Sequence, residues 1–276
     1  MFKSKRFKNG LLFTTLLTLL IINSIPIVLV IINSFRTNAE IKIALFGLPK
    51  QLNFANYITV FKTAKYLRSY IINFTVGFAT IVIVVILILF ASYGIVKLKG
   101  YGSRFFTGYF TASLSIPAFS IMVPLFFIFN KLGLVKTIPG IILIFVAISI
   151  PFNFLFMRAF LIGMPSEIEE AARIDGASEL QIVRYIILPL AKPIILTVAI
   201  IIFTTTWNEF LIPNIFLSGS GYRMVSQNFY LFSGEYNTNL AYVFTAAVFT
   251  IMPIVVLYLL FQKSFVEGMT KGGIKG

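Results

Sequence analysis

Six long apolar runs dominate this chain of 276 residues and limit its possible folds more than any other feature. They are Leu11–Ile32, Tyr70–Ile95, Phe105–Phe129, Ile138–Phe160, Pro193–Ile212 and Leu240–Phe261. Each has about 20 residues or more, the length at which a helix crosses a bilayer. A helix can cross because it satisfies its own backbone hydrogen bonds. The sequence therefore predicts an all-α polytopic membrane protein with six transmembrane helices.

The composition excludes a water-soluble enzyme. Hydrophobic residues make up 58% of the chain, charged residues make up 12%, and the mean hydropathy is +0.95. Soluble domains are about half apolar and about a quarter charged. The net charge of +14 would suggest nucleic acid for a soluble chain, but basic residues also gather at the ends of membrane spans. We therefore expect the lipid bilayer as a partner, and no nucleic acid.

The basic residues also predict an orientation. With both termini cytoplasmic, the inner segments hold 14 of the 23 Lys and Arg residues; these segments are 1–10, 96–104, 158–192 and 262–276. Several of the others lie in the long first loop, which weighs less in this rule. We therefore expect a multi-pass protein of the cell (cytoplasmic) membrane with both termini inside.

Three regions follow from this layout. Residues 1–66 contain a basic segment, the first span and a long outer loop. Residues 67–262 form the core transmembrane domain, which includes a polar segment at 164–189, and residues 263–276 form a cytoplasmic tail.

The usual groups for catalysis and metal binding are missing. The chain has no Cys and no His, which removes disulfides, thiolate zinc sites and the commonest general base. It also lacks a G-x-x-x-x-G-K-[ST] phosphate loop, so any ATP hydrolysis has to occur in a partner. We expect neither an enzyme nor a protein with its own metal or cofactor.

Segment 164–189, between the fourth and fifth runs, has a different charge character from the rest of the chain. Five of the nine acidic residues lie in it: Glu167, Glu169, Glu170, Asp175 and Glu179. The concentration of these acidic residues in one expected cytoplasmic loop indicates that this loop has a function of its own.

The spacing in this segment predicts two short helices. Ser166 and Glu169 have the S-x-x-E pattern of a capping box, and Gly176 is a natural helix stop. The second helix begins with a similar S-x-x-Q box at Ser178 and Gln181 and is expected to end at Pro189. The apolar faces expected for the two helices are Ile168, Ala171 and Ala172, and then Leu180, Val183 and Ile187. The segment is either an amphipathic surface loop or a helix–turn–helix that docks on a partner.

A motif in this segment favours the second interpretation. Glu170-Ala171-Ala172, Gly176, Ile186 and Leu188-Pro189 occur at the spacing of the EAA motif. The chain thus resembles the membrane permease subunits of ATP-binding-cassette importers, in which this element is the coupling helix that docks on an ATPase. The resemblance implies an ATPase-coupling role for Glu169, Glu170, Ala171, Ala172, Asp175, Gly176, Ala177, Ile186, Leu188 and Pro189.

Other segments are similar to the carbohydrate branch and to its maltose-type permease with six spans. They are Asn33–Ile41, Trp207–Pro213 and the tail Glu267–Gly276. The resemblance implies that Lys271, Gly272 and Gly273 of the tail contact the ATPase. On composition alone, the tail could equally lie beside anionic lipid.

The family resemblance also implies partners. They are a second homologous permease subunit, two ATPase domains that hold ATP and Mg, and an extracellular sugar-binding protein. The expected function is import of a sugar or oligosaccharide. The alternatives are an importer permease for a non-sugar solute and a stand-alone six-span secondary transporter or channel.

Polar residues near the spans are candidates for the substrate pathway: Asn73, Asn130, Asn208 and Glu209. An acid close to a membrane span suggests a function, but Glu209 could also lie at the interface or pack structurally. The three Asn residues could bind sugar hydroxyls or join helices. We expect Trp207 to be an interfacial anchor.

Overall fold

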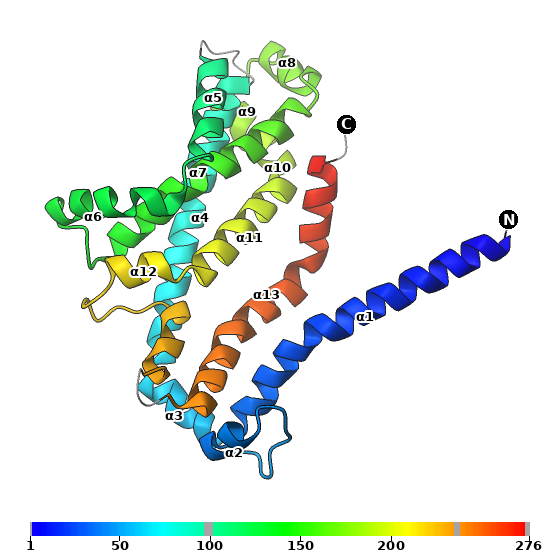
Figure 1. Cartoon of the computed structure of the whole chain (residues 1–276). Coiled ribbons are helices and arrows are strands. Elements are labelled where there is room, and N and C mark those ends of the chain that lie inside the picture. The colour runs from blue at the N-terminus through cyan, green and yellow to red at the C-terminus, as the bar shows by residue number, and fades with distance from the viewer. Residues whose placement is uncertain (1, 97–101, 235–237, 274–276) are drawn as a thin grey trace. The chain divides into compact units, whose positions relative to one another are not determined.

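The computed structural model describes residues 2–96, 102–234 and 238–273, and these ranges contain helices and no strand (Figure 1). The prediction of an all-α fold is confirmed. The chain forms two compact units that do not follow sequence order. The first unit is Met1–Leu67 with Asn228–Pro253, and the second is Arg68–Gln227 with Ile254–Gly276.

The first unit contains α1 (Phe2–Ser34), α2 (Asn38–Ile43), α3 (Ala55–Thr63) and the first part of α13 (Leu240–Gly273). Arg36, which is buried, organises the turn after α1. Its guanidinium donates to the carbonyls of Ala44 at 2.8 Å and Glu40 at 2.9 Å and to Asn33 Oδ1 at 2.8 Å. Thr245 of α13 donates to the Ser34 carbonyl at 3.1 Å, which attaches α13 to the end of α1.

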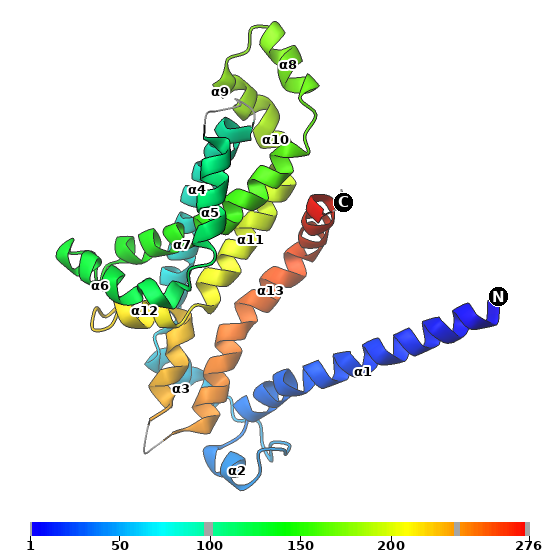
Figure 2. The ribbon, with the colours of Figure 1, turned by 45° about the horizontal axis from the view of Figure 1, so that its top comes forward.

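The second unit holds most of the helices (Figure 2). They are α4 (Tyr66–Val96), α5 (Ser103–Ser113), η1 (Ala118–Ile121), α6 (Met122–Lys131), α7 (Ile138–Ile162), α8 (Glu167–Ile174), α9 (Glu179–Ile182), η2 (Val183–Ile187), α10 (Leu188–Leu190), α11 (Lys192–Asn208), α12 (Leu211–Phe216), the start of η3 (Val225–Phe232) and the part of α13 from Ile254 onward. Helix α7 contacts α5, α11 and α12 and is therefore central. Buried apolar residues of α4, α7, η2 and α11 form one cluster that includes Val84, Phe154, Ile187 and Val198.

Four helices in the described residues are long and apolar enough to cross a membrane. They are α1 over Asn9–Ser34, α4, α7, and α13 over Leu240–Gln262. A fifth candidate is a pair of helices, Glu179–Leu190 and Lys192–Asn208, bent by 73° at the break between them.

The third predicted span is divided into α5, η1 and α6. Pro117 has no backbone N–H and lies in an extended conformation, with φ of −61° and ψ of 125°. Proline also disfavours helical geometry in the residue before it. The run therefore contains two short helices joined by a 3₁₀ turn instead of one long helix.

Candidate coupling site

Helix α8 ends as the sequence predicts. Gly176 is left-handed, with φ of 83°. Its N–H donates to the Arg173 carbonyl at 3.1 Å, and the Ala177 N–H donates to the Ala172 carbonyl at 2.9 Å. This pair of bonds is a Schellman motif, in which a left-handed residue closes the helix. The sharp turn after α8 is therefore a property of the backbone.

The predicted capping box at the start of α8 is wrong. Ser166 has helical backbone angles and makes no side-chain capping bond. The physical reason is the position of Glu169, which is buried and reaches Arg173 Nη2 at 3.8 Å instead of turning back to residue 166. The helix nevertheless begins at the predicted place.

The second capping box is confirmed. Gln181 Oε1 accepts from the Ser178 N–H at 2.7 Å, and Ser178 Oγ accepts from the Gln181 N–H at 3.4 Å. The prediction that the second helix ends at Pro189 is wrong by one residue, because the helical turns that begin at Glu179 continue to Leu190. The break follows at Ala191.

Helices α9 and η2 are rooted in the core of the second unit. Ile182, Val183 and Ile187 are buried in the same cluster as Leu89 of α4 and Met157 of α7. Leu180, predicted on this face, is instead 64% exposed. Leu180 lies in the first turn of α9 beside Ser178 and Gln181, which are also exposed, whereas Val183 and Ile187 in the following π-helical turn are buried as predicted.

Helix α8 presents most of its surface to the outside. Ile168 is 45% exposed and Ile174 is 86% exposed, so the predicted inward apolar face is only partly correct. Ala172 and Ala177 pack against the core cluster from its edge. Figures 1 and 2 show α8 at the end of the second unit where α4 ends and α5 begins.

Arg173 connects the two halves of the segment. Its Nε donates to Glu179 Oε1 at 2.7 Å, and its Nη2 donates to Glu179 Oε2 at 3.1 Å. The same Nη2 lies 3.3 Å from the Tyr93 hydroxyl of α4. The hydrogen bond from Arg173 is the main cause that lowers the pKa of Glu179. Sequence patterns did not single out Arg173 or Tyr93, because their partners are close only in the folded chain.

The structure places the ten predicted coupling residues in three environments. The exposed ones are Glu170, Ala171, Asp175, Gly176, Leu188 and Pro189. Ala172, Ala177 and Ile186 are partly buried, and Glu169 is buried. The predicted tail residues Lys271, Gly272 and Gly273 end α13, and their side chains lie outside the described part of the structure, as do residues 274–276.

Two of the predicted pathway residues have structural partners. Asn73 is buried, and its Oδ1 accepts from the Val225 N–H at 2.7 Å. Glu209 Oε1 accepts from the N–H groups of Leu211 at 2.9 Å and Ile212 at 3.2 Å, so it caps the start of α12. A carboxylate is favourable at that end of a helix.

The other two pathway candidates, Asn130 and Asn208, are exposed near the ends of α6 and α11. Trp207 is fully buried and packs against Tyr70, Phe74 and Phe203. Its predicted role as an interfacial anchor is therefore wrong. The neighbouring aromatic rings on α4 and α11 enclose the indole.

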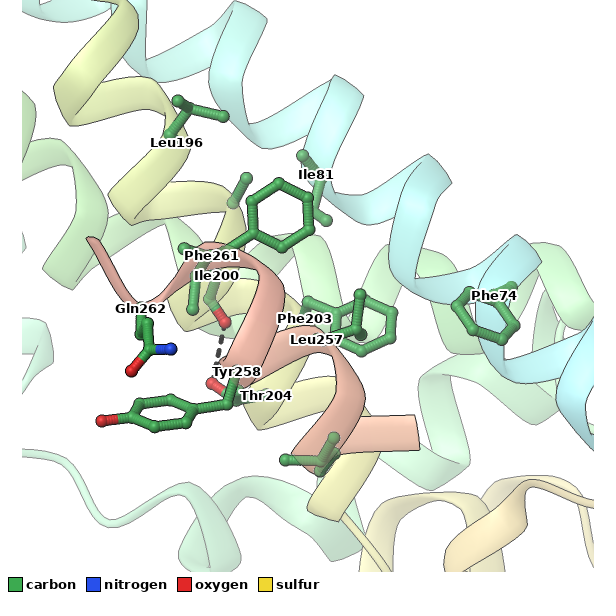
Figure 3. Close-up of a pocket in the computed structure, with 12 residues that line it drawn as sticks. Phe74, Ile81, Leu196, Ile200, Phe203, Thr204, Leu257, Tyr258, Phe261 and Gln262 are labelled. Carbon is green, nitrogen blue, oxygen red and sulfur yellow. Dashed lines mark hydrogen bonds between the residues drawn. The ribbon is translucent and has the colours of Figure 1, made fainter. Parts of the chain in front are cut away.

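Two of the hollows in the second unit differ in the polarity of their linings. One, of about 320 Å³, lies between α4, α11 and α13 and has an apolar lining that includes Phe74, Leu196 and Phe203 (Figure 3). The Thr204 hydroxyl there donates to the Ile200 carbonyl of its own helix at 2.8 Å. This groove suits apolar contacts.

The other hollow, of about 790 Å³, follows α5 and is lined in part by hydroxyl and guanidinium groups; its lining residues are Ser103, Arg104, Thr107, Gly108, Thr111, Ala112, Ser115 and Arg158. Our sequence reasoning missed it. The signal was available as Ser or Thr at every fourth position from 103 to 115, which places three hydroxyls on one face of α5 and the fourth, that of Ser115, in the turn after it.

Comparisons with known proteins agree with this architecture. Residues 88–271 match the family described as "Binding-protein-dependent transport system inner membrane component". The arabinooligosaccharides transport system permease protein AraQ of Halalkalibacterium halodurans is 34% identical over 257 residues, which cover 91% of each chain. The diacetylchitobiose uptake system permease protein NgcG of Streptomyces coelicolor is 30% identical over 250 residues, covering 90% of this chain and 83% of that protein.

A solved structure supports the fold. A chain from a bacterial ABC transporter involved in the import of the acidic polysaccharide alginate matches with a TM-score of 0.78 and 24% identity. The match covers 93% of this chain and 96% of that chain. Together with the motif and the helical architecture, these matches show that this chain belongs to the family of inner membrane components of binding-protein-dependent transport systems.

Proposed function

We propose that this chain is a permease subunit of an ATP-driven importer that takes up a sugar or oligosaccharide delivered by an extracellular binding protein. The observation that carries the proposal is the division of segment 164–189 into a half that is buried in the core and a half that is exposed. Helix α8 exposes Ile168 and Ile174 together with the carboxylates of Glu167, Glu170 and Asp175. Such a surface can bury apolar area and pair its acids with basic groups of a partner.

The partner that fits this surface is an ATPase subunit. The chain has no phosphate loop of its own, so the energy for uphill import has to enter through a protein contact. In the complete importer, two ATPase domains would bind on the cytoplasmic side and hold ATP and Mg. A second homologous permease subunit would complete the pathway, and both termini of this chain would be cytoplasmic.

The sugar assignment rests on relatives and on one hollow. The two relatives named above are described by their transport of arabinooligosaccharides and diacetylchitobiose. The hollow along α5 offers hydroxyls and two guanidinium groups, which are suitable partners for the hydroxyls of a sugar. The apolar groove of Figure 3 has no comparable chemistry.

The coupling role can be tested at Gly176. Gly176→Val places a β-branched side chain at φ of 83°, which costs roughly 1–2 kcal/mol or more in backbone strain. Gly176→Asn is the matched control, because Asn tolerates the left-handed conformation. Steric clash of the new side chain does not contribute to the difference between the variants, since nothing lies within 4 Å of a Cβ at this position.

We expect Gly176→Val to lose most of the co-purifying ATPase or most transport, and Gly176→Asn to retain both. Co-expression with a tagged ATPase subunit, followed by uptake in vesicles, measures the two quantities. Normal assembly and uptake in Gly176→Val would contradict the coupling role.

The substrate class can be tested separately. The complex should hydrolyse ATP faster when a sugar-loaded cognate binding protein is added, and a panel of sugars and non-sugar solutes identifies the ligand. Stimulation by an amino acid or phosphate alone would contradict the sugar assignment. Transport by the bare chain without an ATPase would favour a stand-alone transporter.

A further inference from the structure

A tyrosine outside the coupling segment holds both helices of the segment in place. Tyr93 lies near the end of α4 and is 3% exposed. Its hydroxyl donates to the Glu179 carboxylate of α9 and lies 3.3 Å from Arg173 Nη2 of α8. We call these three residues, Tyr93, Arg173 and Glu179, the clamp. They belong to three different helices of one unit.

The clamp joins α8 to α9 and α4 by charge-assisted hydrogen bonds. Arg173 binds both oxygens of Glu179, at 2.7 Å and 3.1 Å, and this bidentate arrangement fixes orientation as well as distance. On its other side, Arg173 faces Glu169, which is buried one turn earlier in α8. Helix α8 is also attached through the turn at Gly176 and through edge packing by Ala172 and Ala177. A displacement of α8 therefore acts on Arg173.

From the clamp, α4 extends over 31 residues as one helix, Tyr66–Val96. Its buried residues Val84 and Ile88 lie in the core cluster together with residues of α7 and α11. Because a continuous helix is stiff, a shift of its end at Tyr93 moves the residues that line the core further along.

We propose that Tyr93 is a positioning residue for energy coupling, which passes movement of α8 to the membrane-spanning helix α4 through Arg173 and Glu179. This inference rests on the proposed docking of α8 to an ATPase. It assigns to Tyr93 a role in transmission and leaves docking to the exposed face of α8. The hydroxyl of Tyr93 is the essential group, since the ring alone is held by packing.

The test uses the complete importer in lipid vesicles and measures substrate taken up per ATP hydrolysed. The variants are Tyr93→Phe, Glu179→Gln and the double variant. Tyr109→Phe is the matched control, because its ring lies 60% exposed on α5 and outside the clamp. Glu179→Gln should lower the ratio about tenfold, the size expected for loss of charge-assisted hydrogen bonds. Tyr93→Phe should lower it several-fold, and the double variant should be no worse than Glu179→Gln, since both changes disrupt one network.

In the same samples, the amount of co-purified ATPase should equal that of the unaltered complex. This readout separates transmission from assembly, which a merely structural role would impair. Unchanged uptake per ATP in Tyr93→Phe and Glu179→Gln would overturn the proposal, and so would loss of the ATPase from these variants. Normal assembly and transport in Gly176→Val would contradict the docking of α8. A defective Gly176→Val beside fully coupled clamp variants would overturn the clamp alone.

Discussion

Helices α8 and α9 are neighbours in sequence and share a similar starting pattern, yet their environments are opposite. Ile182, three residues into α9, is fully buried, whereas Ile174 at the end of α8 is 86% exposed. One half of the segment belongs to the core of the second unit, and the other half stands at its surface. The difference suggests a division of labour, in which α9 and η2 anchor the segment and α8 meets the partner.

The largest expected effect is on stability, when an isoleucine is replaced by alanine in the buried half and, for comparison, in the exposed half of segment 164–189. Ile187→Ala should lower the free energy of unfolding by about 2–5 kcal/mol, because it removes a fully buried side chain from the core cluster. Ile174→Ala should change it by less than about 0.5 kcal/mol. Thermal unfolding in detergent measures both. Equal stability losses would contradict the division between the halves.

For binding of the ATPase, the order of the two variants should be reversed, with the larger effect at Ile174. Ile174→Ala is expected to weaken binding of the ATPase several-fold, because it truncates the most exposed large apolar residue of α8. Titration of the purified ATPase against the permease in nanodiscs measures this affinity. An unchanged affinity would remove Ile174 from the docking surface.

A smaller effect on stability is expected at the N-termini of α8 and α9. Ser178→Ala should cost about 0.5–2 kcal/mol of stability, since Ser178 forms a complete capping box with Gln181. Ser166→Ala should cost less than about 0.5 kcal/mol, because Ser166 makes no side-chain cap. The unfolding midpoints of the two variants, compared in the same detergent, measure this difference in stability. A larger loss for Ser166→Ala would mean that the first box forms after all.

Much of the fold could be predicted from the sequence because apolar length and helix-stop residues act locally. The four long spans, the left-handed Gly176 and the second capping box depend on neighbours within a few residues. The division of the third run also had a local signal in Pro117 and Pro124.

Two of the remaining features are settled within a few residues. Glu169 faces Arg173 one turn later in α8 instead of making the expected capping bond, and Leu180 lies in the exposed first turn of α9. Other features depend on contacts between distant segments. Trp207 is buried because α4 supplies Tyr70 and Phe74. The hydroxyl-lined hollow beside α5 needs Arg158 of α7 as a wall. No single window of sequence contains these partners.

The most direct test of the coupling site uses the absence of cysteine in this chain. Ile174→Cys in α8 and Ile43→Cys in α2 introduce single thiols at positions that are 86% and 87% exposed. A thiol-attached photo-crosslinker should join the ATPase subunit to position 174 and leave position 43 unlinked. Crosslinks from position 43, or equal yields from both, would contradict the claim that α8 is the surface through which this permease meets its ATPase.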